Sequence, residues 1–351
     1  MKRKSILIAL FIVSLLSAIG QKKDKVIVIK SDQNNAEYLY NDAVKSYNEK
    51  NFSEAIERLQ LSIKENDTLP APHFLLGVIH REMNKKQISI QSFLKYIELS
   101  TIKDTAFYII AQIYNEENKP DSALMFLKSC TDHNPNFCQA HYLKGVINFE
   151  KSYYDEAIHH FSKAIEINSE NSDVYNDRGS TYRLLEKYED ALNDYDKAIV
   201  LNKKAIYYNN RGSLKVKMEK FDEAIDDYTS AIVLDYNYYL AINNRGMAKL
   251  GIKDYTGAIH DFNLCLEKNK DYYASISNRG IAYYKIKKYK EAIEDFDYIL
   301  TINPSDASTY LHRGNTKEMI RDNEGACQDW QKAAELGIEE AKKYIKNQCE
   351  N

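Results

Sequence analysis

Residues 244–262 read NRGMAKLGIKDYTGAIHDF, and this stretch decides the fold because its pattern returns along the chain. The positions equivalent to its first glycine follow one another at steps of 34 residues, with a single step of 33. Each holds a small residue: Ala43, Gly77, Ala111, Gly145, Gly179, Gly212, Gly246, Gly280 and Gly314. Self-similarity at such a period is the signature of a repeat protein.

Each unit has two further fixed positions. Twelve residues after the first small residue comes a second one, and four residues later comes a bulky apolar residue. These pairs are Ala55/Leu59, Ser89/Phe93, Ala123/Leu127, Ala157/Phe161, Ala191/Tyr195, Ala224/Tyr228, Ala258/Phe262, Ala292/Phe296 and Ala326/Trp330. Small residues let two antiparallel helices approach closely, and large ones fill the space beside them. The pattern therefore predicts two packed helices in every unit.

The composition agrees with a helical, surface-charged protein. The chain has 351 residues, of which only 12 are Gly and 5 are Pro, while 28 are Tyr and 28% are charged with mixed sign. The scarcity of Gly and Pro excludes collagen, low-complexity linkers and a loop-rich β fold. The net charge of −3 argues against a nucleic-acid partner.

The small, large and small pattern of each unit resembles the tetratricopeptide repeat. The resemblance implies an all-α fold, a right-handed α-solenoid of nine helix-turn-helix repeats with a C-terminal capping helix. A solenoid leaves its terminal apolar face open, so a cap is expected. The boundaries predicted for the repeats are 36–69, 70–103, 104–137, 138–171, 172–204, 205–238, 239–272, 273–306 and 307–340. The cap is predicted over 341–351, with an amphipathic pattern that starts near Glu339.

The N-terminus is predicted to be an export signal. Basic residues 1–4 precede an apolar run over 6–20 that is short for a membrane span, and Ala18 and Gly20 fit a signal-peptidase site. The alternative is an uncleaved anchor with the same orientation, which would be the chain's contact with a membrane. Residues 21–35 are interpreted as a tether. We expect the body to lie in the periplasm or cell envelope of a bacterium, or to face the periplasm from an inner-membrane anchor.

Oppositely charged residues at two fixed positions of the repeat predict structural ion pairs between the two helices of a unit. Five units carry Arg before the small position and Asp sixteen residues after that Arg, and the first unit reverses the charges. The pairs are Arg178–Asp194, Arg211–Asp227, Arg245–Asp261, Arg279–Asp295, Arg313–Asp329 and Asp42–Arg58. A charge reversal at paired positions indicates that the side chains meet, the alternative being an accidental surface coincidence.

The five cysteines allow two disulfides in an exported chain. Cys327 and Cys349 lie on the last repeat and the cap, and a bridge between them would pin the cap. Cys130 and Cys138 flank one turn between repeats and form the second candidate pair.

Motifs for catalysis and metal binding are missing from the sequence. CxxC and HExxH, which bind metals, do not occur, and neither do the glycine-rich loops that hold phosphates. We therefore expect no enzyme activity, no metal and no cofactor.

The family resemblance implies that the first helices line a concave groove that receives an extended peptide or a partner's helix. The predicted groove residues are Asn176, Asn209, Asn210, Asn243, Asn244, Asn278, Tyr108, Tyr142 and Phe74. Three of these, Asn210, Asn244 and Asn278, fall where the O-linked N-acetylglucosamine transferases carry an asparagine ladder that grips a peptide backbone. An amide side chain both donates and accepts, so such a row can pair with peptide groups. In the alternative interpretation the asparagines cap or solvate helices and the aromatics cover helix flanks.

The function predicted from these observations is a non-catalytic scaffold that binds a polypeptide in its groove. The first alternative is a structural subunit of a cell-envelope assembly that uses its outer surface. A further alternative is an accessory subunit of an envelope glycan-processing enzyme, for which the chain shows no room for a catalytic domain.

Overall fold

The structure is a computed structural model and describes residues 35–349. Contacts between Cα atoms divide the chain into two compact units, residues 1–181 and 182–351, and the division falls within one helix, α10 (Ser172–Leu184). The predicted export signal and all but the last residue of the predicted tether lie outside the described residues.

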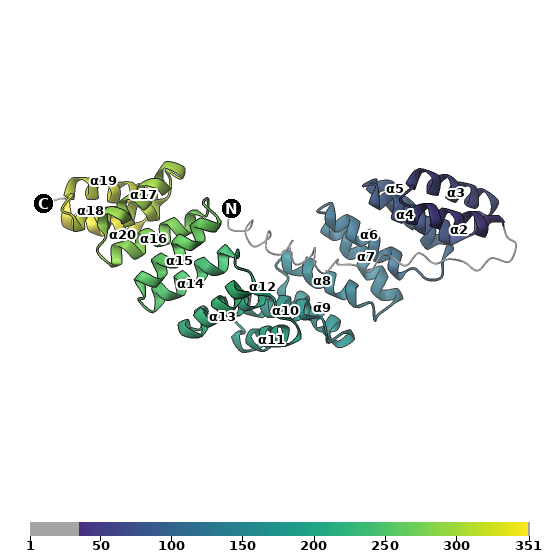
Figure 1. Cartoon of the computed structure of the whole chain (residues 1–351), viewed down its shortest axis with the longest axis horizontal. Helices are drawn as coiled ribbons and strands as arrows, with labels where there is room; N and C mark the ends of the chain where they lie inside the picture. Colours follow the sequence, from purple (N-terminus) through teal and green to yellow (C-terminus); the bar gives the residue numbers. More distant parts are fainter. Residues whose placement is uncertain (1–34, 350–351) are drawn as a thin grey trace. The chain divides into compact units, whose positions relative to one another are not determined.

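Every regular element among residues 35–349 is an α-helix (Figure 1). Helices with even numbers begin the repeats: α2 Asn35–Asn48, α4 Pro70–Glu82, α6 Asp104–Glu116, α8 Cys138–Glu150, α10 Ser172–Leu184, α12 Ala205–Lys217, α14 Tyr239–Gly251, α16 Tyr273–Lys285 and α18 Ala307–Met319. Each is followed by a second helix: α3 Phe52–Glu65, α5 Lys86–Leu99, α7 Pro120–His133, α9 Tyr154–Ile167, α11 Tyr188–Leu201, α13 Phe221–Leu234, α15 Tyr255–Lys268, α17 Tyr289–Ile302 and α19 Asn323–Glu335. The chain closes with α20 Glu339–Gln348.

The same tight turn joins the two helices of every repeat. Its central residue has a left-handed backbone at Lys50, Asn84, Asn118, Ser152, Glu186, Glu219, Lys253, Lys287 and Arg321, with φ between 57° and 65°. In the seventh repeat Lys253 N–H donates to Leu250 O at 3.0 Å and Asp254 N–H donates to Lys249 O at 2.9 Å. This pair of bonds satisfies carbonyls that the helix end would otherwise leave unpaired. The turn is therefore a helix-ending motif repeated nine times.

Direct contact explains the spacing of sixteen residues between small and bulky positions. A Cβ placed on Gly246 would lie 2.7 Å from Phe262 Cε1, and one on Gly145 would lie 2.5 Å from the Phe161 ring. Real Cβ atoms essentially never come so close. The aromatic ring of the second helix therefore rests on the bare backbone of the first.

The identity of the small residue follows the size of its partner. The two units that carry Ala at this position, Ala43 and Ala111, have Leu59 and Leu127 sixteen residues later. The seven units with Gly have an aromatic residue there instead. Leu59 and Leu127 are fully buried in their clusters, as the aromatic residue Phe262 is in another. The pair keeps its combined volume, as a close-packed core requires.

The predicted fold class is confirmed as an all-α array of helical pairs. First and second helices pack against one another in the eight repeats that lie within one compact unit, and inside each compact unit successive pairs stack on one another. The first helix begins at Asn35, one residue before the predicted boundary, and α20 begins at Glu339 rather than at 341. Within 35–349, no helix combines the length and the apolar character that crossing a membrane needs.

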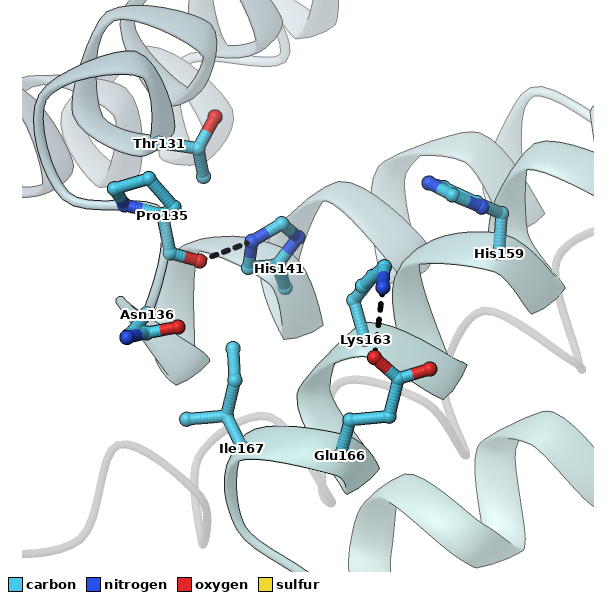
Figure 2. Close-up of a pocket in the computed structure, with 8 residues that line it drawn as sticks. All are labelled: Thr131, Pro135, Asn136, His141, His159, Lys163, Glu166 and Ile167. Carbon is cyan, nitrogen blue, oxygen red and sulfur yellow. Dashed lines mark hydrogen bonds and ion pairs between the residues drawn. The ribbon is translucent and has the colours of Figure 1, made fainter.

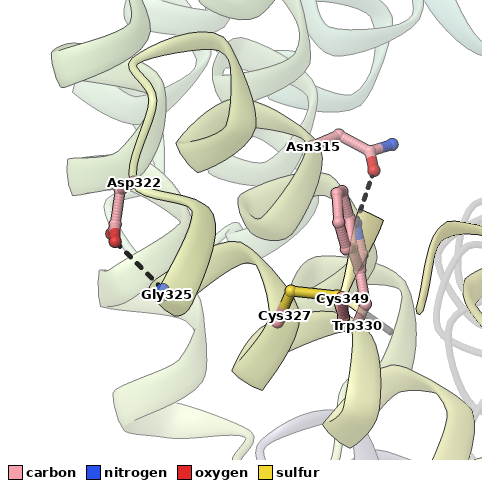
Figure 3. The surroundings of a disulfide bond; sticks show 6 residues. All are labelled: Asn315, Asp322, Gly325, Cys327, Trp330 and Cys349. Carbon is pink, nitrogen blue, oxygen red and sulfur yellow. Dashed lines mark hydrogen bonds between the residues drawn. A yellow bond between two sulfur atoms is a disulfide. The ribbon is translucent and has the colours of Figure 1, made fainter. Parts of the chain in front are cut away.

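A disulfide ties the last helix to the last repeat (Figure 3). Cys327 of α19 is bonded to Cys349, the residue that follows α20, as the sequence predicted. The ring of Tyr344 stacks on Trp330 with centroids 5.2 Å apart, so α20 covers the bulky residue of the ninth repeat. Trp330 Nε1–H also donates to Asn315 Oδ1 at 2.8 Å. The cap thus buries the apolar end of the array.

The second predicted disulfide is wrong, because Cys130 and Cys138 are both free thiols. Cys130 is fully buried in the cluster around Leu127 and Ala140. Cys138 packs against a different cluster, which includes Val146, and its thiol donates to a backbone carbonyl of α9 at 3.4 Å. The two side chains therefore contact different clusters, and only Cys130 is fully buried.

Candidate functional site

The arginines that precede the small positions form ion pairs inside the repeats. Arg211 holds Asp227 in a bidentate contact, with Nε to Oδ2 at 3.0 Å and Nη2 to Oδ1 at 2.6 Å. The structure brings the same atoms together in Arg245–Asp261, Arg279–Asp295 and Arg313–Asp329. The reversed pair also meets, with Arg58 Nε 3.2 Å from Asp42 Oδ2. Arg178 and Asp194 belong to the same repeat but to different compact units of the chain, and their pairing stays a prediction.

All four arginines with a bidentate aspartate also reach the second helix of the preceding repeat, and Arg245 does so by donating to Thr229 Oγ1 of α13 at 3.2 Å. Arg211 Nη1 lies 2.6 Å from Asp196 Oδ1 of α11, and Arg313 Nη1 lies 2.5 Å from Asp297 Oδ1 of α17. Arg279 donates to a side-chain amide oxygen of α15 at 2.6 Å in the same way. One side chain therefore joins three helices, which assigns it to the stability of the array rather than to a ligand.

Lysines add a second cation to three of the buried aspartates. Lys215, Lys249 and Lys317 lie 2.8–2.9 Å from Asp227, Asp261 and Asp329, respectively. The equivalent position beside Asp295 holds Tyr283 instead. Burial raises the pKa of Asp295, although the hydrogen bond from Arg279 partly opposes that shift.

Two asparagines of the predicted ladder make hydrogen bonds to other side chains of the protein. Asn244 Nδ2 donates to Asn209 Oδ1 at 3.0 Å, and Asn278 Nδ2 donates to Asn243 Oδ1 at 3.3 Å. Ser275 Oγ donates to the same Asn243 Oδ1 at 2.9 Å. These bonds link the first helices of successive repeats, so the amides that sequence analysis assigned to a ligand hold neighbouring helices together.

Burial corrects the assignment for three of the asparagines. Asn176, Asn209 and Asn243 are only 5–6% exposed, too little for a peptide to reach their amides. Asn176 donates to Asp177 Oδ1 at 3.1 Å on its own helix. The remaining three are half-buried, and their role in binding a ligand stays a prediction: Asn210, Asn244 and Asn278.

Two of the predicted aromatic residues line a cavity between first helices. We call it the aromatic pocket, with a volume of about 130 Å³. Its lining residues come from α6, from α8 and from the turn before α10: Tyr108, Gln112, Asn115, Glu116, Cys138, Gln139, Tyr142, Leu143, Val146, Asn168 and Asn171. Two of the residues that the sequence assigned to ligand binding therefore line this cavity, while Asn278 lines another one together with Tyr273 and Asn303.

Hydrogen bonds fix the orientation of both tyrosines in the aromatic pocket. Tyr142 Oη donates to Asp177 Oδ2 of the next first helix at 2.7 Å. Tyr108 Oη accepts from Gln112 Nε2 at 3.1 Å, and Gln112 Oε1 accepts from Arg81 of the preceding first helix at 3.0 Å. The rings are held in place before any ligand arrives.

The third predicted aromatic residue does not belong to the pocket. Phe74 makes edge contacts with Phe93 and Tyr96 at centroid distances of 5.4 and 5.1 Å. It packs against the buried cluster of the second and third repeats. Phe74 is half-buried, and its role in binding a ligand stays a prediction.

Sequence analysis missed the amide side chains around the aromatic pocket. Gln112, Asn115 and Gln139 lie on α6 and α8, while Asn168 and Asn171 lie in the turn between α9 and α10. None of them was singled out by the repeat grid of small and bulky positions, so periodicity carried no signal for them. Only the folded structure, which brings successive repeats together, places these amides in one pocket with Tyr108 and Tyr142.

A second, more open hollow lies between the third and fourth repeats (Figure 2). It is lined by residues of α7 and the turn after it, and by histidines and a Lys–Glu pair of α8 and α9: Thr131, Pro135, Asn136, His141, His159, Lys163, Glu166 and Ile167. His141 Nε2 lies 3.0 Å from Pro135 O, and the Lys163 ammonium lies 2.7 Å from Glu166 Oε2. We call this surface the histidine hollow.

Two neighbouring histidines of this region are kept neutral by their surroundings. Burial lowers the pKa of His160 to about 4, and the charges of Lys144, His159 and His141 act in the same direction. Burial also lowers the pKa of His141, whose ring centroid lies 5.8 Å from that of His160. Over residues 35–349, no group of three His, Cys, Asp or Glu side chains is arranged to hold a metal ion.

Comparison with known proteins gives one consistent family. Models of the tetratricopeptide repeat match residues 139–171, 172–204, 205–238 and 274–306. The C-terminal part of a TPR repeat-containing protein from Cytophaga hutchinsonii superposes with a TM-score of 0.58 at 16% identity, covering 68% of this chain and 98% of that one. At that identity the likeness concerns the fold alone.

Curated relatives share only parts of their length with this chain. Stress-induced-phosphoprotein 1 of Caenorhabditis elegans is 24% identical over 185 residues, which are 51% of this chain and 55% of that protein. A UDP-N-acetylglucosamine–peptide N-acetylglucosaminyltransferase of Giardia intestinalis is 26% identical over 111 residues, 32% of this chain and 7% of the enzyme. The chain thus spans about half or less of the length of these relatives.

Proposed function

This chain is a tetratricopeptide repeat protein, and from that premise we propose that it is a non-catalytic scaffold whose first helices bind a polypeptide partner. Repeats of this family are typical of protein-binding adaptors. The proposal places the binding surface on the first helices of repeats three and four, at the aromatic pocket.

The observation that carries the proposal is the aromatic pocket itself. It joins an apolar floor, with Leu143 and Val146 buried on α8, to a rim of amide side chains from two repeats and a turn. Mostly apolar concave sites with a few polar groups are the usual form of a ligand site. Its fixed tyrosines mean that little conformational entropy is lost on binding.

We further propose that the protein acts after export, in the periplasm or cell envelope of a bacterium. The support is the sequence of residues 1–20, a basic start followed by an apolar run. In this proposal the chain contributes binding alone, and turnover of a glycan or peptide substrate by the purified protein would contradict it.

A second candidate function uses the outer surface in place of the first helices. The histidine hollow favours it, because its lining comes mainly from second helices and the turn after α7, with the exposed His159 and Asn136. In that case the protein is a structural subunit of an envelope assembly, and a partner would cover the hollow.

One pair of variants separates the two candidates. Asn115 lines the aromatic pocket and Asn136 lines the histidine hollow, and neither side chain makes a hydrogen bond in the described part of the chain. Asn115→Trp fills the pocket and Asn136→Trp fills the hollow, and neither substitution removes a side-chain hydrogen bond that the fold needs. Polypeptides captured from source-cell extract by the immobilised full chain are then compared by mass spectrometry. We expect Asn115→Trp to abolish capture and Asn136→Trp to leave it unchanged; the reverse result would favour the outer surface.

A further inference from the structure

The aromatic pocket has the size of one apolar side chain. Its volume of about 130 Å³ is close to the ~150 Å³ of an engineered apolar cavity that takes up benzene. Its floor consists of Val146, fully buried, Leu143, 6% exposed, and the ring of Tyr142. A Leu, Met or Phe side chain fits this space.

Two amide side chains beside that floor are available to hydrogen-bond to a ligand. In the described part of the chain, neither Asn115 of α6 nor Gln139 of α8 makes a side-chain hydrogen bond. Each carries two donors and an acceptor, the complement of a peptide N–H and C=O. The two amides can therefore hydrogen-bond to the main chain of a peptide that crosses the aromatic pocket and points one side chain into it.

A carboxylate without an ion-pair partner lies next to the pocket. Glu150 ends α8 one helical turn after Val146, so both residues point to the same face. Glu150 is exposed and makes no ion pair among residues 35–349, whereas Glu116 inside the pocket is already paired with Arg81 and Lys86. Desolvation by its neighbours raises the pKa of the Glu150 carboxyl, and a cation beside it would stabilise the charged form. The charge beside the aromatic pocket that has no ion-pair partner among the described residues is therefore negative.

We propose that the aromatic pocket anchors an extended segment of the partner through one Leu, Met or Phe side chain, with a Lys or Arg next to it that pairs with Glu150. This inference rests on the proposed function and specifies its ligand. The apolar side chain supplies the affinity, since burial of one such group is the larger contribution, and the exposed ion pair supplies a preference among sequences.

The chain contains its own reporter for this site. Cys138 lines the pocket and is half-buried, whereas Cys130 and Cys265 are fully buried and Cys327 and Cys349 are bonded to each other. A thiol reagent should therefore modify Cys138 first in the unreduced, folded protein. An occupied pocket should slow that modification.

The experiment measures the alkylation rate of Cys138 in the full chain by peptide mapping and mass spectrometry. The probe is a Gly/Ser peptide with Lys-Leu-Lys at its centre, and the matched control peptide has Lys-Ser-Lys. At a probe concentration of about ten times its Kd the rate should fall by about tenfold. The control peptide should leave the rate unchanged, and equal protection by both peptides, or by neither, would overturn the inference.

Two charge variants test the role of Glu150. Glu150→Lys should weaken the protection by Lys-Leu-Lys by about two- to fivefold. Glu156→Lys makes the same charge change on an exposed residue of the second helix in the same repeat and should have no effect. Equal effects of both variants would show attraction by net charge and would overturn the role of Glu150.

Two further outcomes separate this inference from the proposed function. If the full chain captures a polypeptide that leaves Cys138 fully reactive, the pocket anchor is wrong while the scaffold function stands; if no polypeptide is captured, the function itself fails. The segment 25–30, Lys-Val-Ile-Val-Ile-Lys, lies outside the described residues and has the same chemistry. If replacing it by serines makes Cys138 several-fold more reactive without any probe, the chain's own segment is the occupant and the proposal of a foreign partner is overturned.

Discussion

The contact between Gly246 and Phe262 predicts how two substitutions will combine. Gly246→Ala adds a Cβ that meets the buried ring at 2.7 Å, and overpacking of this kind costs about 1–3 kcal/mol. Alanine favours a helix over glycine by about 1 kcal/mol. The net loss of stability for the single variant is therefore about 0–2 kcal/mol, although the same change on an exposed helix face would stabilise.

The second substitution should relieve the first. Phe262→Leu alone leaves a cavity and costs on the order of 1 kcal/mol, less than the complete truncation of a core Phe. Together the two changes recreate the pairings Ala43/Leu59 and Ala111/Leu127 that the chain already uses. The double variant should be more stable than the sum of the single effects predicts by about 1 kcal/mol or more, as residues in direct contact usually are.

Urea unfolding followed by far-UV circular dichroism measures the cycle, with hydrogen exchange over α14 and α15 to locate the change. Local exchange is needed because repeat arrays do not always unfold in one step. The matched control combines Gly246→Ala with Phe296→Leu of the next repeat, whose ring packs on Gly280 instead, and it should give additive effects. Additivity in the Gly246/Phe262 cycle itself would refute the argument that the ring size dictates the glycine.

Other interactions lead to three further predictions. Arg279→Ala should cost about 3–5 kcal/mol because it leaves the buried Asp295 without its bidentate partner and no lysine lies at the equivalent position beside it, while Arg58→Ala at the more exposed pair should cost less than about 1 kcal/mol; both are read from urea midpoints. Cys349→Ser opens a loop with a sequence separation of 22 and should cost the C-terminal end about 3 kcal/mol, seen as faster hydrogen exchange in α20; equal exchange in both proteins would contradict it. Burial lowers the pKa of His160 from 6.5 to about 4, so the native state binds fewer protons than the unfolded state in this window, and stability should fall as the pH drops from 6.5 to 4. His160→Gln should flatten that part of the stability profile, and an unchanged slope would show that other groups cause it.

Most of the fold could be predicted from the sequence because each contact occurs many times. Residues sixteen positions apart, such as Gly246 and Phe262, vary together from one repeat to the next, and a single chain then carries the information of several related sequences. The charge reversal at Asp42 and Arg58 identified a contact for the same reason. Periodicity reports which residues meet whenever both partners belong to the repeating pattern.

The candidate site was harder to predict because it depends on departures from the pattern. Asn209 and Asn243 occupy a position of the repeat that was expected to face a ligand. Each amide instead accepts a hydrogen bond from an asparagine 35 residues later. The position in the repeat alone does not show this. The aromatic pocket includes Asn171 of a turn, which has no place in the helical pattern. The thiols of Cys130 and Cys138 are near in sequence but contact different clusters, and spacing cannot distinguish these cases.

The covalent link between Cys327 and Cys349 changes what can happen at the end of the chain. A carboxypeptidase that trims the C-terminus, or a force that pulls on it, meets a residue anchored in the interior of α19. Helix α20 cannot peel away turn by turn from that side while the bond is intact. While the bond is intact, α20 is therefore held on the last repeat, and a reductant would remove that restraint.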